Sequence, residues 1–266
     1  MASSFSQRHG YRQRGPITVR EDAPQSVRAC LLTILREMGF SYTDIRNVIC
    51  PVLRKFPDPN NWSEIPNVRD EAIGLIQTCE WWRVYDIIEA IYAFFRQAEA
   101  RDPFTQAINN LFEEEGIGWQ LVDGRILTRG SDEFEHGVVQ AVAILDTAGH
   151  QTAKTELEEA RRDLSRRPDP DITGAIQHCM ASLECTVRTI ANDPRATLGE
   201  IVGRRAAELR IPRPLDEAIV KAWGYASEMA RHLREGRTPT REEAEFLVGL
   251  SASLTTYLLQ KANRPV

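Results

Sequence analysis

The sequence predicts a mostly α-helical protein of two domains: a helical N-terminal domain with one small β-hairpin, and a C-terminal helical bundle. Apolar residues recur at the three- and four-residue spacing of amphipathic helices along most of the 266 residues. The period changes near residues 118–128, where apolar and polar side chains alternate. Apolar residues make up 42% of the chain and charged residues 27%, which is typical of a globular protein.

The N-terminal half is predicted to form a series of helices over residues 27–38, 45–56, 68–79, 82–95 and 104–112. Asp22 is suited to cap the first helix and Gly39 to end it. Pro51 is expected to kink or break the second helix, and the turn-forming run that starts at Phe56 predicts a loop. The aromatic stripe that begins at Trp82 repeats on one helical face, so we expect it in the core.

The segment 118–128 is predicted to be a β-hairpin. Asp123-Gly124 lies at its centre, and a type I′ turn needs positive φ at both central residues, which this pair tolerates. Ser131 can cap a helix that runs to about Leu145. We therefore place the domain boundary here, with residues 1–130 in the first domain and 131–266 in the second.

The second domain is predicted to be helical throughout. Helical periodicity covers residues 132–145, 155–164, 175–190 and 215–235. Two capping boxes, Thr197-Leu-Gly-Glu200 and Thr240-Arg-Glu-Glu243, each open a further helix. Helices of this length and spacing are typical of a bundle.

Several function classes are disfavoured by the sequence. The five cysteines match no zinc signature, and neither a Gly-rich phosphate loop nor a Ser-His-Asp order is present, so we expect no metal and no cofactor. Residues 1–15 lack the apolar stretch of an export signal, and no run approaches the roughly 20 apolar residues of a membrane span. We expect a cytoplasmic protein without a membrane segment. The net charge of −5 means that any nucleic-acid site must be local.

The N-terminal half carries three recognisable stretches. They are Phe5-Ser-Gln-Arg-His-Gly-Tyr11, Cys79-Glu-Trp-Trp-Arg-Val-Tyr-Asp86 and Trp119-Gln-Leu-Val-Asp-Gly-Arg-Ile126. In order and spacing they resemble the N-terminal domain of bacterial AbiJ-type abortive-infection proteins. The resemblance implies a role in phage defence.

The C-terminal half is similar to the HEPN-like helical domain that accompanies such N-terminal domains. The matching pieces are Asp169-Pro-Asp171, Met180-Ala-Ser-Leu-Glu184, Ala196-Thr-Leu-Gly199, Trp223-Gly-Tyr225, Arg231-His232 and Glu243-Ala-Glu-Phe246. HEPN domains are commonly metal-independent endoribonucleases that act as homodimers. The resemblance therefore implies RNA, a second copy of the chain and a protein of the same defence system as candidate partners.

Metal-free RNA cleavage needs a base, an acid and cations for the phosphorane charge, which histidine and arginine supply. His232 is the best candidate, because it adjoins Arg231 and on a helix lies one turn after Glu228, whose carboxylate could orient the ring. We predict Arg231, His232 and Glu228 as catalytic residues. Arg234 and Arg237 would extend a local RNA-binding patch.

The N-terminal arm supplies two further RNA-binding candidates, Arg8 and His9, although a basic terminal segment is more often only solvated. His136, His150 and His178 lack metal-ligand spacing and are predicted to be ordinary helix residues. Glu184 lies on an apolar face, where a buried carboxylate is usually the partner of an arginine.

Two alternatives to the nuclease stay open. Arg231 and His232 are adjacent, whereas the HEPN signature separates them by several residues, and neighbours on a helix diverge by about 100°. The pair could instead form salt bridges with Glu228 and Glu235 and finish a helix, which leaves a non-catalytic interaction or sensor module. A nucleotide-transfer enzyme is the other alternative, but no acidic metal pair at a convincing spacing supports it.

Overall fold

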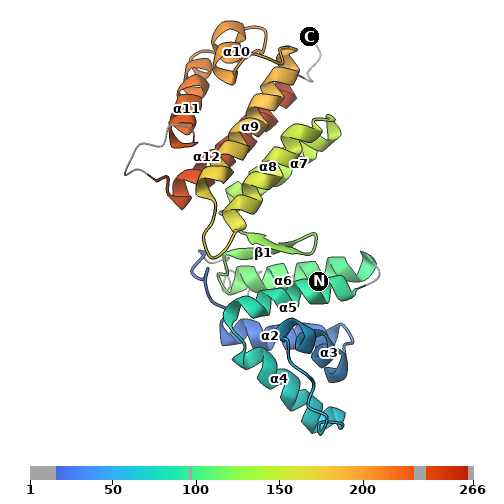
Figure 1. Ribbon diagram of the computed structural model, residues 1–266. Coiled ribbons are helices and arrows are strands. Elements are labelled where there is room, and N and C mark those ends of the chain that lie inside the picture. The colour runs from blue at the N-terminus through green and yellow to red at the C-terminus, as the bar shows by residue number, and fades with distance from the viewer. Residues whose placement is uncertain (1–15, 96–97, 231–237, 263–266) are drawn as a thin grey trace, which may run out of the picture. The chain divides into compact units, whose positions relative to one another are not determined.

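The computed structural model of the protein describes residues 16–95, 98–230 and 238–262. Over these residues it is mostly α-helical and contains one two-stranded antiparallel sheet (Figure 1), so the predicted fold class is confirmed. The chain divides into two compact units, residues 1–129 and 130–266. Among the described helices, none combines the length and apolar character that crossing a bilayer requires.

The first unit consists of short helices followed by the hairpin. Its elements are α2 (Gln25–Glu37), α3 (Tyr42–Leu53), the short π-helix η1 (Glu64–Val68), α4 (Arg69–Thr78), α5 (Trp81–Phe94), α6 (Ala98–Glu114), β1 (Trp119–Val122) and β2 (Arg125–Thr128). Large side chains from several of these helices form one core; fully buried members are Leu31, Leu35, Ile45, Ile88, Phe104 and Phe112.

The hairpin has the predicted turn. Trp119 pairs with Thr128 and Val122 with Arg125, and the two central residues have φ of +47° at Asp123 and +79° at Gly124. The turn lies against α5, because a Cβ added at Gly124 would come within 2.5 Å of the Tyr92 ring. Glycine is therefore needed there both for its backbone conformation and for its lack of a side chain.

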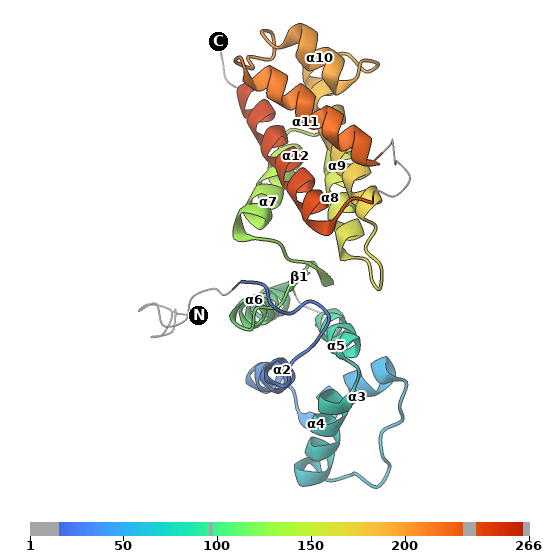
Figure 2. The same cartoon turned by 90° about the vertical axis from the view of Figure 1, so that its left-hand side faces the viewer.

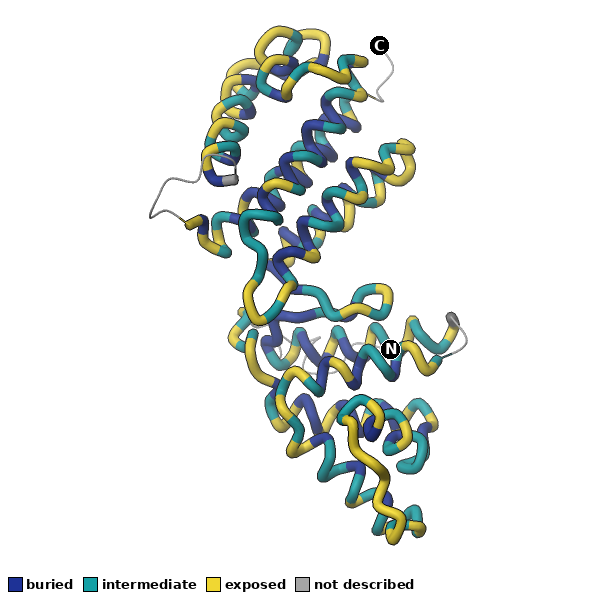
Figure 3. The backbone as a smooth tube through the Cα atoms, viewed as in Figure 1, coloured by how far each residue is buried: buried dark blue, intermediate teal, exposed yellow. Residues whose placement is uncertain are grey.

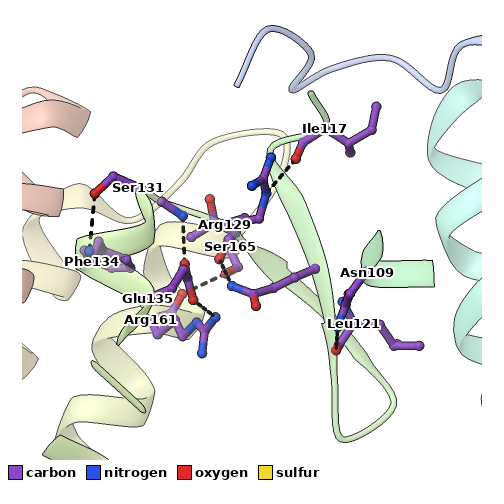
Figure 4. Close-up of polar contacts among 12 residues, drawn as sticks. Asn109, Ile117, Leu121, Arg129, Ser131, Phe134, Glu135, Arg161 and Ser165 are labelled. Carbon is purple, nitrogen blue, oxygen red and sulfur yellow. Dashed lines mark hydrogen bonds and ion pairs between the residues drawn. The ribbon is translucent and has the colours of Figure 1, made fainter. Parts of the chain in front are cut away.

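Asn109 holds the hairpin to α6. Its side-chain amide donates to the carbonyl oxygen of Leu121 at 2.9 Å and its oxygen accepts from the Leu121 N–H at 2.7 Å (Figure 4). This reciprocal pair satisfies a backbone donor and acceptor of β1 that the two-stranded sheet would otherwise leave to solvent.

The second unit is a bundle of longer helices. They are α7 (Asp132–Thr147), α8 (Gln151–Ser165), α9 (Ile172–Ala191), α10 (Leu198–Arg205), α11 (Leu215–Ala230) and α12 (Arg241–Ala262). Helix α9 packs against α8, α10, α11 and α12, and α7 packs against α8 and α12 (Figures 1 and 2). Figure 3 shows α9 buried along much of its length, so it is the central helix of this unit.

The predicted helix starts in the second unit are confirmed by their caps. The Ser131 hydroxyl accepts from the Phe134 N–H at 3.2 Å (Figure 4). Thr197 and Glu200 form a reciprocal capping box. Thr240 and Glu243 form another, with the Thr240 N–H donating to Glu243 at 2.8 Å and the Glu243 N–H to the Thr240 hydroxyl at 3.3 Å.

Some local predictions were wrong. Helix α3 ends at Leu53, because Arg54 takes the left-handed conformation with φ of +54°, so residues 54–56 are not helical. Pro51 stays within the last turn of α3 and does not break it. Trp82 is 45% exposed, so the aromatic stripe of α5 is not wholly in the core.

Candidate functional site

Most residues predicted to carry the chemistry lie outside the described residues. They are Arg231, His232, Arg234, Arg237, Arg8 and His9. Glu228 is described and is exposed in the last turn of α11, whereas the neighbouring Met229 is buried.

Helices α11 and α12, which precede and follow residues 231–237 in the sequence, are in contact with each other. The Tyr225 hydroxyl donates to Glu243 Oε1 at 2.8 Å, and the other carboxylate oxygen of Glu243 accepts from the Thr240 N–H at 2.8 Å. Below these contacts, Ala226 and Met229 pack in one apolar cluster with the first turns of α12. These contacts join α11 and α12 close to residues 230 and 238, between which the structure describes no residue.

A second titratable cluster lies between α8 and α9 and was not predicted. His178 Nδ1 lies 2.7 Å from Glu156 Oε2, and His178 Nε2 lies 3.6 Å from Asp163 Oδ2. Asp163 also forms an ion pair with Arg166 at 2.9 Å. Burial raises the pKa of the Asp163 carboxyl, and the charges of Arg166 and His178 oppose that rise.

This cluster is suited to joining the two helices rather than to RNA cleavage. Both ring nitrogens of His178 face carboxylates, so neither is directed at a substrate. The negative charge of Glu156 and Asp163 would also repel a phosphodiester. His178 was predicted to be an ordinary helix residue; it lies on α9, and its contacts with Glu156 and Asp163 make it part of the packing between α8 and α9.

The other buried or partly buried polar groups of the second unit are structural. Glu184 is 6% exposed; it accepts from the Leu198 N–H at 3.3 Å and lies 3.4 Å from Arg188, which confirms the predicted arginine partner. His150 is the residue before α8, where burial lowers its pKa. Within the described ranges, no group of His, Cys, Asp and Glu side chains could hold a metal ion.

Glu135 forms the best-buried ion pair at the start of the second unit. Its carboxylate accepts from Arg161 Nη2 at 2.5 Å and from the Gly130 N–H at 2.7 Å (Figure 4). Burial lowers the pKa of Arg161, and Glu135 counteracts this effect. The pair joins α7 to α8 and leaves this arginine without access to a ligand.

An open depression of about 610 Å³ lies in the first unit, beside the hairpin turn. Arg101 stacks on the Tyr92 ring, 5.2 Å from its centroid, and Arg125 lies 3.7 Å from Glu89. Both arginines that line the depression thus interact with neighbouring side chains. The depression therefore has no cluster of cations directed at a bound anion.

Comparison with known proteins identifies the family. No curated protein matches the sequence, and no solved structure matches it. The family model for AbiJ N-terminal domain 4 matches residues 3–143, which include the first unit and most of α7. That domain associates the protein with abortive infection, a bacterial response to phage. The chain therefore belongs to the AbiJ N-terminal domain 4 family.

Proposed function

We propose that the protein is an RNA-directed effector of abortive infection whose C-terminal unit is a HEPN-like domain. In this proposal Arg231 and His232 cleave RNA without a metal ion, as part of a homodimer in the bacterial cytoplasm. The membership in a phage-defence family supports the biological role, and the all-helical bundle of the second unit is compatible with the domain type.

The reaction would be an internal transfer at one phosphodiester. The imidazole of His232 removes the 2′-hydroxyl proton, the 2′ oxygen forms a bond to phosphorus, and the bond from phosphorus to the 5′ oxygen breaks. His232 of the second copy donates a proton to that leaving oxygen. Arg231, with Arg234 and Arg237, stabilises the additional negative charge on the phosphorane. The products are a 2′,3′-cyclic phosphate and a 5′-hydroxyl.

The observation that carries the proposal is the tie between Tyr225 and Glu243, at 2.8 Å. A catalytic group must be held within a fraction of an ångström of its productive position. This hydrogen bond joins α11 to the first turn of α12, the two helices between which Arg231 and His232 lie in the sequence, and in this proposal it helps to position them. Glu228 is exposed and lies four positions before His232 in the sequence; if the helix continues to His232, its carboxylate would orient the imidazole and stabilise its charged form.

A non-catalytic interaction or sensor module is the second candidate. It is favoured by the adjacency of Arg231 and His232 and by the net charge of −5, which gives RNA no general electrostatic attraction. In that case the protein would bind a partner from the same defence system and leave RNA intact.

The test is RNA cleavage by the purified full-length protein in the presence of EDTA. The wild type should produce fragments that end in a 2′,3′-cyclic phosphate, and His232→Ala should lower the rate by about a hundredfold or more. His136→Ala is the matched control, since His136 is exposed on α7, and should cleave like the wild type.

Two outcomes separate the candidates. Full cleavage by His232→Ala, or a wild-type activity that disappears with EDTA, would overturn the proposed nuclease site. Intact RNA together with a stably co-purifying partner protein would instead support the interaction module.

A further inference from the structure

The loop between α3 and η1 exposes two large aromatic side chains. Phe56 is 98% exposed and Trp62 is 86% exposed, and Figure 3 shows much of this loop as exposed. Rings of this size usually contribute apolar area to a core. Rings that remain in water are often found where a protein binds a partner.

The loop is held in place by α3 and α4. Glu71 on α4 accepts from the Asp58 N–H at 2.8 Å and from the Asn61 side-chain amide at 3.1 Å. Arg46 on α3 donates to the Asn61 carbonyl oxygen at 3.0 Å and forms an ion pair with Glu71 at 3.0 Å. The side chains of Arg46 and Glu71 are only 13% and 12% exposed, so their contacts with each other and with Asn61 are partly shielded from water.

The end of the loop nearest η1 is fixed as well. Glu64 accepts from the Tyr42 N–H at 2.6 Å and from the Thr43 hydroxyl. The hydrogen bond from Thr43 holds the pKa of Glu64 below its usual value, although burial opposes this effect. The backbone that carries Phe56 and Trp62 is therefore anchored. A ligand that binds the two rings would lose little free energy to ordering of the loop.

Two cations precede the first exposed ring. Arg54 and Lys55 are both exposed and directly precede Phe56. Their backbone N–H groups donate to the carbonyl oxygens of Pro51 and Cys50 at 3.1 and 2.9 Å, so the start of the loop is anchored too. Within the described part of the chain, neither side chain forms an ion pair with a carboxylate. Their charge is available to a polyanion.

We propose that this aromatic loop, Arg54, Lys55, Phe56 and Trp62, binds single-stranded RNA. Exposed rings stack on unpaired bases irrespective of sequence, and neighbouring cations contact the phosphates. Six positions separate Phe56 from Trp62, so their Cα atoms can lie at most about 20 Å apart, a span of a few nucleotides. The site lies in the first unit and needs no catalytic residue.

RNA fits the loop better than a protein partner. The core of a protein interface is a contiguous apolar patch surrounded by polar residues. In the sequence of this loop, a largely polar run from Pro57 to Asn61, which includes the carboxylate of Asp58, separates Phe56 from Trp62, and the cations Arg54 and Lys55 directly precede the first ring. Separate stacking surfaces beside positive charge are typical of single-strand binding.

The test is fluorescence anisotropy of a labelled 12-nucleotide single-stranded RNA with 2′-O-methyl groups, which the proposed internal transfer cannot cut, titrated with the full-length protein. The double variant Phe56→Ala/Trp62→Ala should bind at least tenfold more weakly, as expected for the loss of two stacking contacts. The conservative pair Phe56→Tyr/Trp62→Phe should retain the affinity. Phe246→Ala is the control, because Phe246 is 62% exposed but lies on α12 of the other unit, and it should bind normally.

The same titration distinguishes this proposal from the nuclease. Because the methylated RNA lacks the attacking 2′-hydroxyl, the titration measures binding alone, and its result does not depend on whether the protein cleaves RNA. Unchanged affinity in Phe56→Ala/Trp62→Ala overturns the loop proposal. A wild-type protein that does not bind single-stranded RNA also overturns it. If a partner protein then co-purifies with the wild type but not with the double variant, the loop binds that protein instead.

Discussion

At the scale of single residues, Arg28 shows how a buried charge can be satisfied without a carboxylate. It is 5% exposed and donates to the carbonyl oxygens of Ala23 at 2.7 Å, Ile76 at 2.6 Å and Cys79 at 2.8 Å. Two of these acceptors lie at the C-terminal end of α4, where unpaired carbonyls carry partial negative charge. One guanidinium thus joins α2 to the end of α4.

Replacing Arg28 should destabilise the first unit. Arg28→Ala leaves several buried carbonyl groups without a donor, and we expect the free energy of unfolding to fall by about 2–4 kcal/mol. Urea unfolding followed by circular dichroism measures the change. Arg69→Ala is the control, since the Arg69 side chain is 37% exposed, and it should stay within about 0.5 kcal/mol of the wild type. Equal effects of both variants would contradict the role of Arg28.

The acceptors of Arg28 explain why sequence analysis missed it. The arginine sits in an amphipathic pattern, whereas Ile76 and Cys79 lie 48 and 51 positions further along the chain. His178 is a similar case, because Glu156 and Asp163 belong to another helix. Contacts of this kind depend on how the helices pack, and no local spacing encodes them.

At the scale of elements, the local sequence predicted helix starts and the hairpin turn better than it predicted the long-range contacts of single residues. The capping boxes at Thr197 and Thr240 and the turn at Asp123-Gly124 were predicted, because each depends on residues within a few positions of one another. The exposure of Trp82 was not predicted, because the face that a helix buries depends on the helices that pack against it. The anchoring of the 54–63 loop by Glu71 is another long-range contact that the sequence does not show.

The hairpin turn should tolerate no side chain at position 124. Gly124→Ala combines an unfavourable positive φ with a Cβ only 2.5 Å from the Tyr92 ring, so we expect a loss of about 1–3 kcal/mol in urea unfolding. Gly74→Ala is the opposite case. A Cβ there has no neighbour within 4 Å, and alanine in helix α4 should add about 0.5–1 kcal/mol. A Gly124→Ala protein as stable as the wild type would show that the turn does not pack on α5.

At the scale of the whole molecule, the protein joins two units with separate apolar cores. The family match begins at residue 3 and ends at residue 143, so most of the second unit lies beyond it. The nuclease proposal therefore rests on the chemistry of Arg231 and His232 and on the hydrogen bond that joins Tyr225 of α11 to Glu243 of α12. With a net charge of −5, any RNA recognition must come from local groups, and the aromatic loop is the surface that we propose for it.

The most direct measurement follows RNA in phage-infected bacteria that express the protein. Wild-type cells should show fragments with 2′,3′-cyclic phosphate ends after infection and form few plaques, while cells with His232→Ala at equal protein level should keep intact RNA and form plaques freely. Plaque protection by His232→Ala equal to that of the wild type, or protection without any RNA fragmentation, would contradict an RNA-cleaving effector.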